Sequence, residues 1–164
     1  MRDKYFQILA IALSSVGLAF IGFLYLTEPR SLAEVTTKGQ VALGTYEIDR
    51  KEFEAGLASF RVDDFINARA AWGRADPEGK DAATQFYTTY SYYRQGWGRF
   101  SNDDVLFQSG VTAARRVTEI DPNFRVADQT LAIKTPLELK AELEEGLKIT
   151  TADFNPLRLT RERK

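Results

Sequence analysis

The N-terminal part of the chain contains a run of about 22 residues without a charged side chain, from Tyr5 to Leu26. A helix of that length can cross the hydrocarbon core of a bilayer. Tyr5 and Tyr25 lie near the two ends of the run, where amphipathic aromatic rings prefer the membrane interface. The sequence therefore predicts a short tail over residues 1–4 and a transmembrane helix over residues 5–26.

A cleaved signal peptide is the alternative for this run, with Ser31, Leu32 and Ala33 as a small-residue cleavage site. The hydrophobic cores of signal peptides are about 7–15 residues long, which is shorter than the run seen here. We therefore favour a retained helix that acts as an uncleaved signal anchor.

The flanking charges of the predicted span are nearly balanced, because Arg2 and Lys4 precede it and Arg30 and Lys38 follow it. A very short tail before a first span usually stays in the cytoplasm. We expect a single-pass membrane protein with a cytoplasmic N-terminus and with residues 27–164 outside the cytoplasm, in the periplasm if the cell is bacterial.

The predicted span also carries pairs of small residues four positions apart, a spacing that lets transmembrane helices pack closely. The residues are Ala10, Ser14, Ser15 and Ala19. They are candidates for packing against other spans, and the alternative is that they face lipid.

Composition excludes several kinds of chemistry, because the 164 residues include neither cysteine nor histidine. Disulfides, thiolate nucleophiles and thiolate metal sites are excluded, and the commonest general base is absent. A formal net charge of -1 gives no footprint of nucleic-acid binding. The sequence also lacks the motifs of phosphate-binding loops, dinucleotide sites and zinc sites. We expect no enzyme, catalytic residue, cofactor, metal or nucleic-acid partner.

Residues 27–48 have no persistent helical pattern, and Pro29, Gly39 and Gly44 interrupt them, so we interpret them as a linker. Residues 49–77 then read as two short helices around a turn at Asp63 and Asp64. Small and aromatic residues recur along both helices, at Gly56, Phe65, Ala68, Trp72 and Ala75. The small residues allow two helices to cross closely, and the aromatic residues fill the space toward the next pair.

This spacing resembles that of the tetratricopeptide (TPR) repeat, although Glu52, Ala55 and Ser59 stand where the repeat usually has Trp, Leu and Tyr. A second unit follows about 33 residues later, with its matching positions at Thr89, Tyr92, Tyr93, Gly96, Phe107, Gly110, Ala114, Val117, Ile120 and Pro122. It contains an insertion over residues 97–106, after which Asn102 or Asp103 is a plausible N-cap.

A degenerate third unit begins near Pro122, and its helix ends at Thr135 and Pro136. Thr135 and Glu138 form a capping-box pattern for a last helix over residues 135–149 that caps the array, followed by an extended basic tail over residues 150–164. The predicted fold is therefore all-α, with a transmembrane helix and a small TPR-like array of helical hairpins over residues 49–134.

The TPR resemblance implies a groove, lined by the first helix of each unit, that binds protein segments. Carried over residue by residue, the groove would be lined by Phe60, Arg61, Tyr87, Tyr90, Tyr93 and Arg94. The insertion adds candidate contacts with a partner or a membrane surface at Trp97, Arg99 and Phe100. The alternative for the aromatic residues is burial in the core.

Two functions remain open on these grounds. The first is a membrane-anchored scaffold that holds or helps assemble a protein partner at the membrane. The second is an accessory structural subunit of a larger membrane complex, of the energy-transducing or export type, whose span packs against other subunits. Both imply protein partners in a membrane and contact with lipid. Neither needs the acidic pairs Asp63–Asp64 and Asp103–Asp104 as ligands, because both pairs precede predicted helices.

Overall fold

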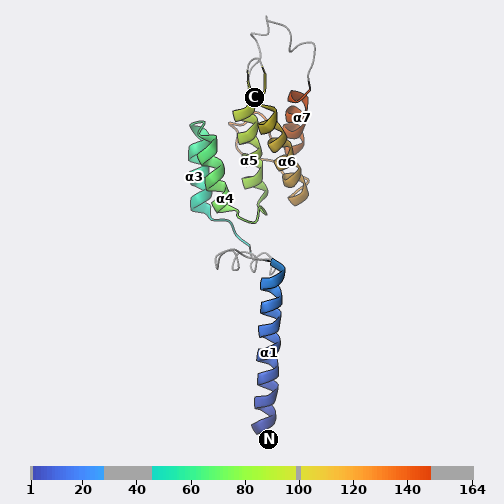
Figure 1. Cartoon of the computed structure of the whole chain (residues 1–164). Coiled ribbons are helices and arrows are strands. Elements are labelled where there is room, and N and C mark those ends of the chain that lie inside the picture. Colours follow the sequence, from blue (N-terminus) through green and yellow to red (C-terminus); the bar gives the residue numbers. More distant parts are fainter. Residues whose placement is uncertain (1, 28–45, 99–100, 149–164) are drawn as a thin grey trace, which may run out of the picture. The chain divides into compact units, whose positions relative to one another are not determined.

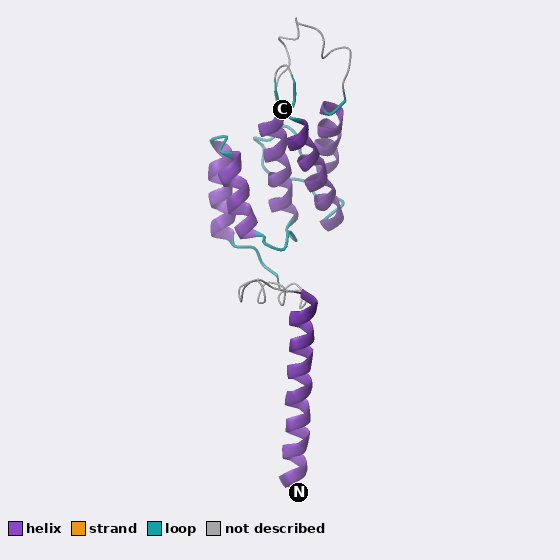
Figure 2. Cartoon of the chain, viewed as in Figure 1, coloured by secondary structure: helices purple, strands orange, loops and turns teal. Residues whose placement is uncertain are grey.

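The computed structural model describes residues 2–27, 46–98 and 101–148 of the chain. Within these ranges it contains six helices and no strand, which confirms the all-α prediction (Figure 2). The helices are α1 (Arg2–Thr27), α3 (Arg50–Arg61), α4 (Phe65–Ala75), α5 (Ala82–Gly96), α6 (Asp104–Ile120) and α7 (Pro136–Gly146). The chain divides into two compact units, residues 1–47 and 48–164, which are described separately below.

Helix α1 is the long apolar helix expected at the N-terminus. Its stretch Tyr5–Phe23 is long and apolar enough to cross a membrane, and no part of it is buried by the protein itself. A signal sequence near an N-terminus shares these properties with a transmembrane helix.

In the second unit the helices pack as hairpins, as the sequence predicts: α3 pairs with α4, and α5 with α6 (Figure 1). Helix α5 also contacts α4 and α7, and α7 packs on α6. The described residues of this unit share one hydrophobic core, which runs from Leu57 on α3 to Leu143 on α7.

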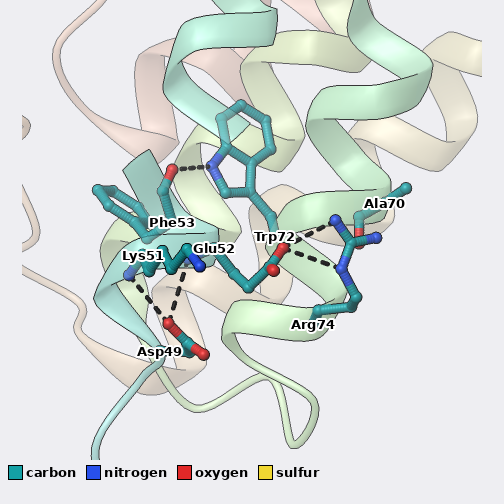
Figure 3. Close-up of polar contacts among 7 residues, drawn as sticks. All are labelled: Asp49, Lys51, Glu52, Phe53, Ala70, Trp72 and Arg74. Carbon is teal, nitrogen blue, oxygen red and sulfur yellow. Dashed lines mark hydrogen bonds and ion pairs between the residues drawn. The ribbon is translucent and has the colours of Figure 1, made fainter. Parts of the chain in front are cut away.

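The α3–α4 hairpin closes around Trp72, whose side chain is almost fully buried (Figure 3). The indole Nε1 donates a hydrogen bond to the backbone oxygen of Phe53 at 3.2 Å. A Cβ atom on Gly56 would overlap the indole ring, so only glycine permits this approach of the two helices. At the edge of the hairpin, Glu52 and Arg74 form an ion pair at 2.7 Å. The glycine and tryptophan positions are therefore packed as the sequence predicts.

Capping residues set the helix boundaries. Asp49 caps α3 by accepting hydrogen bonds from the backbone of Lys51 and Glu52, as Figure 3 shows. Asp64 caps α4 and Asp103 caps α6. Each carboxylate satisfies helix N–H groups that have no partner within the helix. The predicted structural role of Asp64 and Asp103 is confirmed.

The α5–α6 hairpin repeats the use of small residues at close contacts. A Cβ on Gly96 would press against Phe107, and one on Gly110 would press against Leu143 of α7. Between the hairpins, Arg69 of α4 donates hydrogen bonds to Ser91 and Gln95 of α5. Helix α5 ends at Gly96, and α6 begins at Asp104, within the predicted insertion.

Helix α7 begins with the predicted capping box: the Thr135 hydroxyl accepts from the Glu138 backbone, and the Glu138 carboxylate accepts from the Thr135 backbone. Leu139 and Leu143 are fully buried. The helix predicted just before it, as the start of a third unit, does not form. Residues 121–135 are non-helical, because Asp121 and Asp128 each accept a hydrogen bond from a backbone N–H two residues later, at Asn123 and Thr130.

Candidate functional site

The predicted groove was the face formed by α3 and α5, and the structure places most of its residues in the core. Phe60 lies at the centre, with its ring about 6 Å from those of Phe65, Trp72, Tyr87 and Tyr90. The exposed fractions of the groove residues Phe60, Tyr87, Tyr90 and Tyr93 are 3%, 6%, 1% and 2%. The prediction that these aromatic side chains line an open groove is therefore wrong for this chain.

The two arginines of the predicted groove have different surroundings. Arg94 forms an ion pair with Asp63 at 2.7 Å, and its guanidinium lies over the rings of Phe60 and Phe65. It therefore closes the end of the aromatic cluster as a cation–π partner. Arg61 is exposed. Of the six predicted groove residues, Arg61 alone has an exposed side chain.

The segment that the sequence predicts as the start of a third unit packs against α5. We call residues 121–135 the covering segment. The ring of Phe124 packs against that of Phe86 of α5, with ring centres 5.4 Å apart and a tilt of 45°. Val126, Leu131 and Ile133 are buried in the shared core. The backbone N–H of Val126 donates to the backbone oxygen of Lys134, which closes residues 126–134 into a loop.

Polar contacts fix the covering segment to α5. The Tyr87 hydroxyl donates to the Asp128 carboxylate at 3.1 Å, and the backbone N–H of Ile133 donates to the Tyr90 hydroxyl at 3.4 Å. Both tyrosines thus use their polar tips within the fold. A sign of this arrangement was present in the sequence: Leu131 and Ile133 are large apolar residues two positions apart, a spacing that places both on one face of an extended segment.

The protonation of the Tyr87–Asp128 pair is set by burial and hydrogen bonding. Burial raises the pKa of the Tyr87 hydroxyl, and the nearby Asp128 charge raises it further, so the hydroxyl remains a donor at neutral pH. Hydrogen bonding from the Thr130 side chain is the largest cause that lowers the pKa of Asp128. The carboxylate therefore remains an acceptor for both Tyr87 and Thr130.

We expect acid to weaken this contact. The folded-state pKa of Asp128 is lowered from its ordinary value of 3.8, so its contribution to stability is present above that pH and is lost as the pH falls through the folded pKa. Urea unfolding of the wild type and of Asp128→Asn, compared between about pH 6 and about pH 2, should show a stability difference that shrinks in acid. Tyr87→Phe removes the hydrogen bond to Asp128 and should lower the free energy of unfolding by about 0.5–1.5 kcal/mol at neutral pH. A difference between wild type and Asp128→Asn that stays constant down to the lowest pH would contradict this assignment.

The predicted insertion contacts are only partly described. Trp97 is half-buried and packs against the hydrophobic core, so it does not project as a free contact residue. Arg99 and Phe100 lie outside the described residues. Asn102 fastens the connection instead, because its side-chain amide donates to the backbone oxygen of Gly146 and its oxygen accepts from the Gly98 backbone.

The small residues of α1 lie on an exposed helix surface. Ala10, Ser14, Ser15 and Ala19 are all exposed, and the Ser15 hydroxyl donates to the backbone oxygen of Ile11. That bond satisfies the hydroxyl within its own helix. Packing of this surface against another span stays a prediction.

Among the described residues, no group of three or more Asp or Glu side chains is placed to hold a metal ion. Asp63 is paired with Arg94, and Asp64 and Asp103 cap helices. These three acidic side chains therefore have structural roles.

No protein-family model, curated protein or solved structure matches this chain.

Proposed function

We propose that the protein is a membrane-anchored, TPR-like scaffold that holds or helps assemble a protein partner at the membrane. The observation that carries the proposal is the combination of an apolar helix left uncovered by its own chain with a separate unit of packed hairpins. An uncovered apolar helix of this length is stable only in lipid or against other apolar helices. Hairpins of this kind provide rigid surfaces for protein contacts.

Support for the TPR-like part comes from the first hairpin. The contact between Gly56 and Trp72 occupies the positions at which the repeat pattern has its glycine and its aromatic residue. The burial of Phe65, Ala68 and Ala75 also follows the pattern.

The covering segment changes where a partner would bind. Because the inner face of α3 and α5 is filled by the chain itself, the scaffold would offer its outer surfaces. Ile66 on α4 and Val105 on α6 are large apolar side chains with exposed fractions of 67% and 74%. Both belong to the second helix of a hairpin, and we propose these two side chains as contacts for the partner.

One observation also favours the second candidate function, an accessory subunit of a membrane complex. The exposed small residues of α1 provide a surface for close helix packing that needs no groove. In that case the partner would contact α1, and the hairpin unit would contribute less to binding of the partner.

Site-specific photocrosslinking in native membranes should separate these functions. We expect a crosslinkable amino acid at Ile66 or Val105 to capture a partner protein, and one at the exposed Lys51 of α3 to serve as the matched control. Capture through Ser14 or Ala19 alone would favour the accessory subunit. Both functions would be contradicted if no protein were crosslinked at any of the four positions Ile66, Val105, Ser14 and Ala19.

A further inference from the structure

A positively charged pocket lies between α6 and the connection that joins α4 to α5. Its volume is about 660 Å³, which falls in the range of small-molecule sites. The side chains and backbone that matter for its chemistry are Gly79, Lys80, Thr112, Arg115, Arg116 and Glu119. The groups of α6 are more than thirty residues from Gly79 and Lys80 in sequence, so only the fold brings them together.

The connection that forms one wall is held by a buried carboxylate. Asp76 has an exposed fraction of only 3%. It accepts hydrogen bonds from the backbone N–H groups of Lys80 and Asp81, at 2.8 and 3.1 Å, and from the side-chain amide of Gln85. Because these bonds span the whole connection, they fix the backbone of Lys80 beside the pocket.

The opposite wall is fixed through Gly79. This residue has a left-handed backbone, with φ of 61°, and a Cβ there would lie 2.6 Å from the guanidinium carbon of Arg116. The Arg116 guanidinium can therefore lie against the backbone and donate to the Glu78 oxygen at 3.0 Å. The backbone oxygen of Glu78 is a neutral acceptor, so this hydrogen bond leaves the positive charge of the Arg116 guanidinium unneutralised.

The charges of the pocket are unbalanced. Lys80, Arg115 and Arg116 contribute three cations, and Glu119 contributes the single acid among the lining residues. In the described part of the chain, no ion pair joins any of the three cations to an acidic side chain. All three side chains are exposed, so water screens much of their mutual repulsion, and a bound anion would reduce the remainder.

We propose that this pocket binds a phosphate-bearing anion. Two guanidinium groups and an ammonium group provide forked and point donors that match the several oxygens of a phosphate, and the Thr112 hydroxyl lies among the same residues. The volume of the pocket leaves room for the rest of a larger molecule, so the phosphate could belong to a soluble phosphorylated compound or to a phospholipid headgroup. This binding is independent of the scaffold function.

The test uses the full chain in uncharged maltoside micelles and phosphate-free buffer. Inorganic phosphate is titrated while the backbone amide resonances of Gly79 and Lys80 are followed by NMR. We expect saturable shifts at these two amides. In the double variant Lys80→Gln/Arg115→Gln the affinity should fall about tenfold or more, because two charged donors are lost. Arg116 is left unchanged because it supports the connection through Glu78.

A matched control carries the same change in net charge at another exposed site. Arg50→Gln/Lys51→Gln at the start of α3 should leave phosphate affinity within about twofold, since both side chains are exposed there and are not among the residues that line the pocket. An equal loss in both double variants would show nonspecific attraction and would overturn the proposal. The absence of saturable shifts at Gly79 and Lys80 would do the same.

A second arm distinguishes the sources of the phosphate. Micelles doped with phosphatidic acid are compared with micelles doped with phosphatidylcholine, and a soluble hexaglutamate peptide is titrated separately. Shifts at Gly79 and Lys80 with phosphatidic acid at lower concentration than with inorganic phosphate support a lipid headgroup, and the reverse order supports a soluble compound. Tighter binding of hexaglutamate than of either would overturn the proposal in favour of an acidic protein segment.

Discussion

Replacing Trp72 by alanine should cost about 3–5 kcal/mol of folding stability, which is a large part of the total for a domain of this size. The side chain is 1% exposed, contacts Phe60 and Tyr87 through its ring, and donates its indole hydrogen bond to Phe53. Its removal leaves a cavity where α3, α4 and α5 meet and leaves the Phe53 oxygen without this donor. Urea unfolding in detergent, followed by far-UV circular dichroism, measures the loss.

The contact between Trp72 and Gly56 can be isolated by a double-mutant cycle. Gly56→Ala alone should destabilise by about 1–3 kcal/mol, because the new methyl group overlaps the indole. In the double variant with Trp72→Ala the methyl group meets a cavity, so the two losses should sum to more than the loss of the double variant. Gly73→Ala is the matched control: no atom lies within 4 Å of its Cβ position, and we expect a gain of about 0.5–1 kcal/mol. Additive losses at Gly56 and Trp72 would contradict the packing described here.

The second large effect is expected in the covering segment. Leu131→Ala and Ile133→Ala should each cost about 2–5 kcal/mol, because both side chains are about 95% buried in the shared core. Their loss uncovers the aromatic face of α5, so binding of a hydrophobic dye should rise together with the loss of stability. Urea unfolding and dye fluorescence on the same samples measure the two effects.

Arg125→Ala is the control within the same segment, because this residue is exposed and should change stability by less than about 0.5 kcal/mol. If Leu131→Ala and Ile133→Ala also left the folding stability unchanged, residues 121–135 would not contribute to the core. That result would favour the prediction that the tyrosines of α5 line an open groove.

The hairpins were predictable because their signals are local. Gly56, Phe65, Ala68 and Trp72 are close in sequence, and helical periodicity alone places them on facing surfaces. The caps at Asp64, Asp103 and Thr135 were predictable for the same reason, since a capping side chain and the backbone N–H group that donates to it lie within about three residues of each other. The TPR resemblance itself stays a prediction, because the packing of two hairpins is shared by many helical proteins.

Exposure could not be predicted in the same way. Tyrosine is compatible with a groove or a core, and the outcome at Tyr87 and Tyr90 depends on a segment about forty residues further along the chain. The sequence of that segment also favoured a short helix, and turns at Asp121 and Asp128 prevented it. The phosphate pocket was missed because Lys80 and Arg115 become neighbours only through the packing of α6 against the α4–α5 connection.

The distance along the chain between α5 and its cover also has a consequence for synthesis. The Tyr87–Asp128 contact spans 41 residues, so at a translation rate of about 5–20 residues per second the aromatic face of α5 is complete roughly 2–8 seconds before its cover has been made. During that interval Phe86, Tyr87 and Tyr90 present an apolar surface on the growing chain. We expect this surface to be the part of the nascent protein that chaperones bind, and ribosome profiling of chaperone-bound chains should place the onset of binding after α5 has emerged and its end after residue 135 has emerged.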